Sequence, residues 1–157
     1  MSFWDRFRGG KPDRRTGKLD YLAEALALEK QGDYDAALTS YRLALREAPS
    51  NVRVLENMAI AFSKLGQIDD AIRSYKRALS IDPKLSGAHY GLAFLLIKRG
   101  EISDAAYHLE AFLMDAPAAP ESERWIKHAK HTLDQLHTPA QSDDDELDAP
   151  EFRETGE

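Results

Sequence analysis

The chain has 157 residues, of which 43% are hydrophobic, so it is long enough for one domain with a modest core and two tails. Its net charge of −6 argues against a nucleic-acid-binding protein, and the absence of cysteine excludes disulfides and thiolate metal sites. No run of about 18 apolar residues is present, and the N-terminus lacks the apolar segment of a secretory signal. We therefore expect a cytoplasmic protein.

The first 17 residues form a basic, aromatic arm. Phe3, Trp4 and Phe7 lie close together, and residues 1–18 carry six basic residues against two acidic ones. A glycine pair and a proline then interrupt any helix. Because exposed aromatic side chains are costly in water, we expect the arm to have a docking partner. Two interpretations stay open: weak contact with an anionic membrane surface, or docking in an apolar groove of the same chain or a neighbouring copy, which would allow self-association.

Between residues 18 and 119 the sequence repeats with a period of about 34 residues. Each copy has two apolar-periodic runs around a glycine, a small residue in the second run and a proline at the end. These landmarks are Gly32, Gly66 and Gly100; Ala37, Ala71 and Ala105; and Pro49, Pro83 and Pro117. Glycine ends a helix by adopting positive φ, and the residue before a proline leaves the α region. The spacing predicts helix pairs in residues 18–51, 52–85 and 86–119.

The third copy departs from the pattern in its second run. Leu109 stands where the other two copies have a tyrosine, and Phe112 stands where they have a small alanine. A larger side chain there predicts a different neighbour, the segment 120–137. That segment has one apolar stripe, formed by Trp125, Ala129, Leu133 and Leu136, and is predicted to be a capping helix. Residues 138–157 carry eight acidic residues against one basic residue and are predicted to be a disordered tail.

The repeat pattern resembles the tetratricopeptide repeat (TPR) family over Lys18–Pro117, roughly two thirds of the chain. The resemblance implies an all-α fold, a right-handed superhelix of three TPR helix pairs plus a C-terminal capping helix. It also implies that the first helices of the pairs line a concave groove in which a peptide or helix docks.

The resemblance assigns a set of residues to this groove by position. They are Leu22, Leu26, Arg53, Glu56, Asn57, Ile60, Lys64, Tyr90, Phe94, Ile97 and Lys98. Asn57 matches the family asparagine that clamps the backbone of a bound peptide, since an amide donates and accepts at once. The other polar residues of members that bind a C-terminal carboxylate are missing, so we expect an apolar strip with basic edges, suited to an apolar peptide or an amphipathic helix. The alternative is that several of these residues belong to the core between repeats.

Little in the chain is suited to catalysis. His128 and His131 lie at i, i+3, and Asp134 is a candidate third metal ligand. We interpret these residues as a solvated polar face opposite the Trp125 stripe, because two exposed histidines lack the fixed ligand set that a metal site needs. No Gly-rich phosphate loop, nucleophile elbow or zinc-protease motif occurs. We expect no enzyme, no metal and no cofactor.

These features are compatible with three functions. The favoured one is a non-catalytic protein–protein interaction module, an adaptor, scaffold or co-chaperone-like protein that binds a protein or peptide ligand in the groove. The alternative is a peripheral membrane-associated assembly factor tethered through Phe3, Trp4 and Phe7. A small metal-dependent enzyme built on the two histidines is the third.

Overall fold

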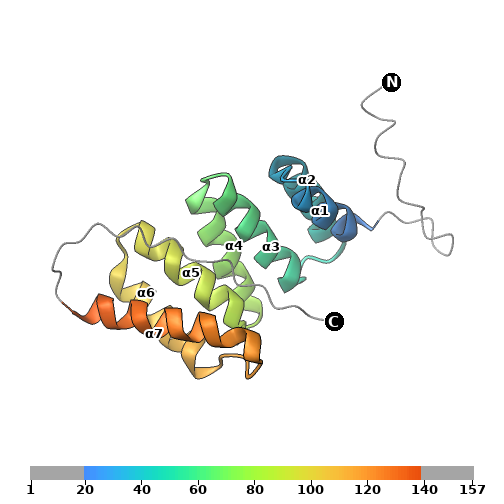
Figure 1. Cartoon of the computed structure of the whole chain (residues 1–157). Coiled ribbons are helices and arrows are strands. Elements are labelled where there is room, and N and C mark those ends of the chain that lie inside the picture. Colours follow the sequence, from blue (N-terminus) through green and yellow to red (C-terminus); the bar gives the residue numbers. More distant parts are fainter. Residues whose placement is uncertain (1–19, 139–157) are drawn as a thin grey trace.

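The computed structural model describes residues 20–138, which form seven α-helices and one short 3₁₀ turn. Helices α1 to α6 make three antiparallel pairs, stacked one after another, and α7 follows at the far end of the stack (Figure 1). The elements are α1 (Tyr21–Lys30), α2 (Tyr34–Glu47), α3 (Val52–Lys64), α4 (Ile68–Ile81), α5 (Ser86–Lys98), α6 (Ile102–Met114), η2 (Pro120–Ser122) and α7 (Glu123–His137).

The first three helices begin at side chains that satisfy the free backbone N–H groups of a helix start. Asp20, Asp33 and Asn51 each accept a hydrogen bond from the backbone N–H three residues later, over 3.0, 3.1 and 3.2 Å. Such N-caps stabilise a helix by about 1 kcal/mol each. The positions where these helices start are therefore set locally.

The three repeated glycines end the first helix of each pair. Gly32, Gly66 and Gly100 have φ angles of 76°, 72° and 77°, a region that other residues rarely adopt. At Gly66 the backbone N–H donates to the Ser63 carbonyl over 3.0 Å, and the N–H of Gln67 donates to the Phe62 carbonyl over 2.9 Å. This is the Schellman arrangement, and it turns the chain back into the second helix of the pair.

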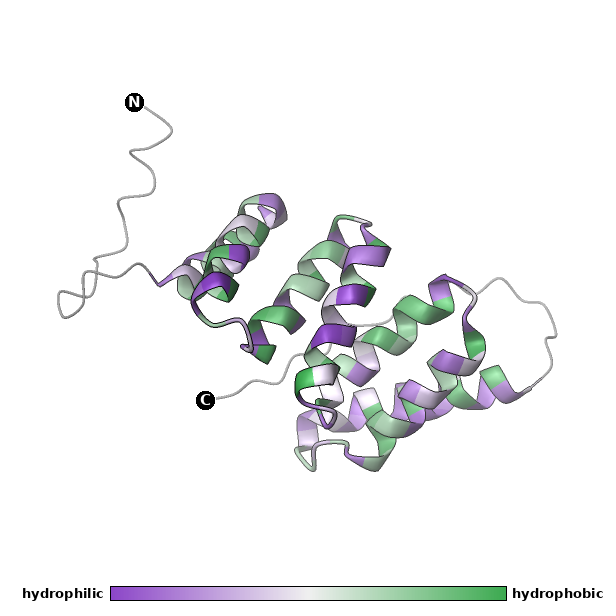
Figure 2. Cartoon of the chain, turned by 180° about the vertical axis from the view of Figure 1, so that it is seen from behind, coloured by the Kyte–Doolittle hydropathy of each residue, from purple (hydrophilic) through white to green (hydrophobic). Residues whose placement is uncertain are grey.

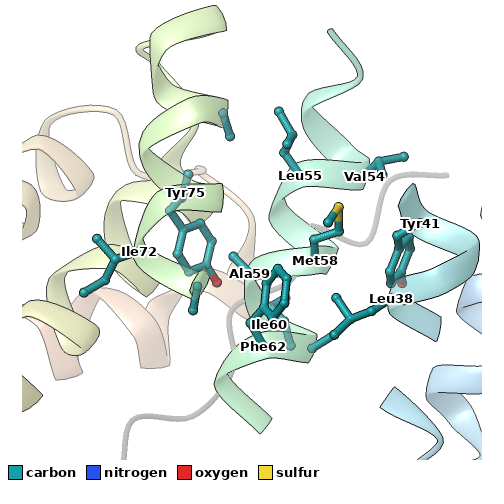
Figure 3. Close-up of a cluster of buried hydrophobic side chains, with 14 of the residues drawn as sticks. Leu38, Tyr41, Val54, Leu55, Met58, Ala59, Ile60, Phe62, Ile72 and Tyr75 are labelled. Atoms are coloured by element: carbon teal, nitrogen blue, oxygen red, sulfur yellow. The ribbon is translucent and has the colours of Figure 1, made fainter. Parts of the chain in front are cut away.

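The main core lies between the stacked helix pairs. Ala37, Ala71 and Ala105 are completely buried, as is Ala78, because small side chains let neighbouring helices approach closely. Figure 3 shows part of this cluster, with Met58 of α3 facing α2 and with the Tyr75 ring of α4 turned towards α3. Ala71, one of the repeat landmarks, therefore lies at a close contact between helices.

A second core lies between the third repeat and α7. Phe112 of α6 is completely buried, and its ring packs edge-on against Tyr90 with a centroid separation of 5.1 Å. Trp125 and Ala129 of α7 close the same cluster. The replacement of alanine by Phe112 is therefore accommodated by α7, as the sequence predicted.

The predicted all-α superhelix of three helix pairs and a capping helix is confirmed for the part of the chain that the structure describes, where no strand occurs. The capping segment differs in one detail, because residues 120–122 form a 3₁₀ turn before α7 begins at Glu123. The aromatic arm and all but the first residue of the acidic tail lie outside the described residues.

Apolar residues alternate with polar ones around most helices (Figure 2). Within residues 20–138, no helix is both long and apolar enough to cross a membrane.

Candidate binding surface

On each of α1, α3 and α5 the predicted groove residues recur at helical spacing and so share one side of that helix; we call these sides together the first-helix face. Leu22 and Leu26 of α1 are half-buried and lie against the main core. Arg53 and Lys64 lie near the two ends of α3 and are exposed, and Glu56 between them is half-buried. The first-helix face is thus partly open at the first two repeats, with apolar side chains beside charged ones.

Two predicted groove residues of α3 are largely interior. Asn57 is 8% exposed and Ile60 is 7% exposed. Only an edge of each side chain is available to a ligand in this structure. The position that corresponds to Asn57 in the third repeat is Gly91, where a Cβ would overlap the Tyr75 ring, so there the chain requires glycine for a helix contact.

In the third repeat, α7 covers the first-helix face. Tyr90 is 1% exposed and packs edge-on against Trp125 with ring centroids 5.6 Å apart. Phe94 is 5% exposed, and the imidazole of His128 stacks on its ring at 4.9 Å. The other two predicted groove residues on α5 are Ile97, which is half-buried and packs against this cluster, and Lys98, which is exposed. With α7 in place, Tyr90 and Phe94 are core residues.

The prediction that His128 belongs to a solvated face is wrong. Its Nδ1 accepts a hydrogen bond from the Tyr90 hydroxyl over 2.7 Å. Burial raises the pKa of the Tyr90 hydroxyl, partly opposed by the charge of Arg124, so the phenol keeps its proton. Burial lowers the pKa of His128, and nearby His131 lowers it further, so the imidazole stays neutral. The pair ties α7 to α5 through a neutral hydrogen bond.

The metal-site alternative gains no support from this geometry. His131 is exposed, whereas His128 is engaged with Tyr90 and Phe94. Between residues 20 and 138 no cluster of three or more metal-ligating side chains occurs.

A second histidine pair, which the sequence analysis did not single out, joins α5 to α6. The Nδ1 atoms of His89 and His108 are 2.9 Å apart, and His89 Nε2 lies 2.8 Å from the Pro83 carbonyl oxygen. Since a carbonyl only accepts, Nε2 of His89 carries the hydrogen, and its bare Nδ1 accepts from Nδ1–H of His108. The two histidines occupy the positions of Leu55 and Ser74 in the preceding repeat, and that substitution is the signal that would have revealed them.

The histidine pair predicts a loss of stability in acid. Burial, helped by the charges of His89 and Lys76 and opposed by Asp104, lowers the pKa of His108 to about 4. The unfolded chain titrates near the ordinary value of about 6.5. Below that value the unfolded state binds a proton that the folded state does not, so stability is complete above pH 6.5 and declines as the pH falls towards 4. Because His108 is only half-buried, we expect its contribution to the loss of unfolding free energy in acid to be about 1–2 kcal/mol.

Urea denaturation of the wild type and His108→Gln at pH 7.5 and pH 5 measures the contribution of His108 to the pH dependence of stability. The difference in unfolding free energy between the two pH values should be smaller in the variant. His137→Gln, at an exposed position, serves as the control and should keep the wild-type difference. Equal pH dependence in the wild type and His108→Gln would contradict the prediction.

Two family models match the sequence. Both are described as tetratricopeptide repeat models, and they match residues 22–86 and 64–124, so that together they span all six paired helices. The chain belongs to the tetratricopeptide repeat family. The three helix pairs are accordingly three TPR units, and α7 is the helix that follows the last unit. No curated protein sequence matches the chain.

Solved TPR structures share this fold. The Yersinia enterocolitica type III secretion chaperone SycD, in complex with a peptide of the translocator YopD, is 20% identical with a TM-score of 0.70, covering 74% of this chain and 88% of that one. PcrH in complex with the chaperone-binding region of PopD is 17% identical with a TM-score of 0.68, covering 74% and 87%. The TPR2B domain of yeast Sti1, in a complex with pHsp70, is 23% identical with a TM-score of 0.66, covering 73% and 94%.

Proposed function

We propose that this TPR protein is a non-catalytic interaction module that binds an apolar or amphipathic segment of a partner protein on the first-helix face. The observation that carries the proposal is the pair Leu22 and Leu26, which stay half-buried at the first repeat while the corresponding α5 residues, Tyr90 and Phe94, are covered by α7. Half-buried leucines one helical turn apart are the kind of anchor site that accepts apolar side chains at helical spacing.

The charges on α3 favour a segment that also carries acidic groups. Arg53 and Lys64 are exposed near its two ends, and Lys98 is exposed on α5. Cationic groups at the edge of an apolar strip orient a ligand and speed its association more than they add affinity. The ligand is therefore expected to be amphipathic, with apolar residues towards α1 and acidic residues towards the ends of α3.

The structural relatives support a binding role of this kind. SycD, PcrH and the TPR2B domain of Sti1 are each described in a complex with a segment or peptide of another protein. By that likeness, the role we propose is that of a cytoplasmic adaptor, scaffold or co-chaperone-like protein. In this chain α7 restricts the accessible part of the first-helix face to the first two repeats.

Selection from a phage-displayed random peptide library tests the proposal. A selected peptide, labelled with a fluorophore, should bind the wild type and lose at least about tenfold in affinity, or about 1.4 kcal/mol, in Leu22→Glu/Leu26→Gln. Glutamate at position 22 copies Glu56 of the second repeat, so the helix tolerates it. Fluorescence anisotropy gives the Kd, and circular dichroism checks that the variant is folded.

Thr39→Glu is the matched control, because it adds one negative charge at an exposed position of α2. It should bind the peptide as the wild type does. Unchanged affinity in the double variant, or a library that yields no peptide at all, would overturn the proposal.

A further inference from the structure

A pocket of about 280 Å³ lies between the second helices of the second and third repeats, α4 and α6. The pocket is lined by residues of three helices, among them Leu79 of α4, His89 of α5 and Ala111 of α6. Two further lining residues of α6, Tyr107 and Met114, form its rim. Tyr107 is 63% exposed and Met114 is 85% exposed. The volume is below the usual range for drug-sized ligands and suits one or two protein side chains. We call it the α4–α6 pocket.

The repeats explain how space for the pocket arises at this junction of the second helices. The residue that corresponds to Ala111 one repeat earlier is Arg77, which lies across the preceding junction and donates from Nη2 to the Pro49 carbonyl over 3.0 Å. At the later junction, His89 takes over the bond to the corresponding carbonyl of Pro83. An alanine at position 111 leaves the space that the arginine side chain fills in the earlier repeat.

The rim of the pocket is apolar in the third repeat, whereas the corresponding residues of the second repeat are polar. Tyr107 corresponds to Arg73, and Met114 corresponds to Ser80. Single exposed apolar side chains are ordinary on a protein surface, but here two of them flank one pocket. This local change favours an occupant with a large apolar or aromatic side chain.

The charge around the pocket favours a basic occupant. Residues 101–115, which include all of α6, contain four acidic residues and no lysine or arginine. Glu101 forms an ion pair with Arg99 over 3.0 Å, whereas Asp104, Glu110 and Asp115 are exposed. Among the residues that line the pocket, Asp115 is acidic and none is a lysine or an arginine.

We propose that the chain's own residues 1–8 dock at the α4–α6 pocket, with one or two of the aromatic side chains Phe3, Trp4 and Phe7 entering it and the remainder contacting its rim of Tyr107 and Met114. Residues 1–18 carry six basic and two acidic residues, which complements the acidic α6. Residues 9–19 span up to about 40 Å when extended, and directly packed helices lie about 8–10 Å apart, so a linker of this length can cross several helices. The site first expected for the arm included Phe94, which α7 covers in this structure.

Paramagnetic broadening in the full-length protein tests this docking. The chain has no cysteine, so Ser2→Cys accepts a single nitroxide label. In ¹H–¹⁵N spectra, the largest loss of intensity is expected at the amides of Tyr107, Ala111 and Met114. Broadening centred on Leu22 and Leu26 would instead place the arm on the first-helix face, and broadening at neither site would show that it does not dock; both results overturn the proposal.

A repeat-derived substitution makes the test specific to the pocket. Ala111→Arg restores the residue that fills the earlier junction and should abolish the broadening on α6. Ala27→Arg adds the same side chain at an exposed position of α1 and should leave the broadening unchanged. If the α6 broadening persists in Ala111→Arg while the spectrum shows a folded protein, the pocket is not the receptor.

A mixed sample separates docking within one chain from docking between copies. Spin-labelled protein without ¹⁵N is added to ¹⁵N-labelled protein without the label. We expect no broadening of α6 in this mixture, because the arm reaches its own pocket. Broadening that appears in the mixture and grows with concentration would overturn the assignment to the same chain in favour of a second copy.

Discussion

Replacing Trp125 with alanine is expected to lower the free energy of unfolding by about 3–5 kcal/mol, the usual cost of removing a buried tryptophan. Trp125 is 5% exposed and forms the centre of the contact between α7 and the third repeat, beside Tyr90 and Phe112. The Arg124 guanidinium also lies over its ring at 4.3 Å. Urea denaturation followed by far-ultraviolet circular dichroism measures the change.

Lys127→Ala is the control on the same helix. Lys127 is exposed and forms only a surface ion pair with Glu123 over 3.0 Å, which is worth well under about 1 kcal/mol. Hydrogen exchange should also show faster opening of α7 in the tryptophan variant than in the control. If both variants unfold at the same urea concentration as the wild type, α7 is not docked as the structure shows.

Replacing Leu92 with alanine should cost about 2–5 kcal/mol, because it leaves a cavity in the main core that rigid helices close only in part. Leu92 is completely buried near the middle of α5, the helix that contacts both α4 and α6. In a repeat protein each unit depends on the interfaces with its neighbours, so a cavity in α5 weakens two interfaces together. Thermal and urea denaturation give the loss in stability.

Lys98→Ala, at an exposed position of the same helix, should change the stability by less than about 0.5 kcal/mol. Because circular dichroism alone does not separate local from global unfolding, the denaturation of Leu92→Ala should also be followed by Trp125 emission, with Trp4→Phe in both proteins so that Trp125 is the sole emitting tryptophan. A Leu92→Ala protein as stable as Lys98→Ala would mean that the interior face of α5 has been misassigned.

The sequence by itself determined where the first helix of each pair ends and where α1, α2 and α3 begin. The turn glycines need positive φ, and the N-cap side chains bond to backbone three residues away, so both signals act over a few residues and recur with the repeat. The burial of Ala71 and Ala78 also follows from the repeat, because small residues recur wherever two helices touch. Phe112 predicted contact with α7, because in the third copy a large side chain replaces one of these recurring small residues.

Only the tertiary structure decided which neighbour covers each apolar residue. Tyr90 and Phe94 occupy the same helix positions as Glu56 and Ile60, yet α7 buries them with His128, a residue the sequence placed on a solvated face. Helical periodicity shows which side of a helix is apolar. It does not show whether that side contacts the paired helix, the next repeat or α7, because a helix inside a stack has apolar contacts with several neighbours. The same limit hid the α4–α6 pocket, because its walls come from three helices and its space comes from one alanine that replaces an arginine.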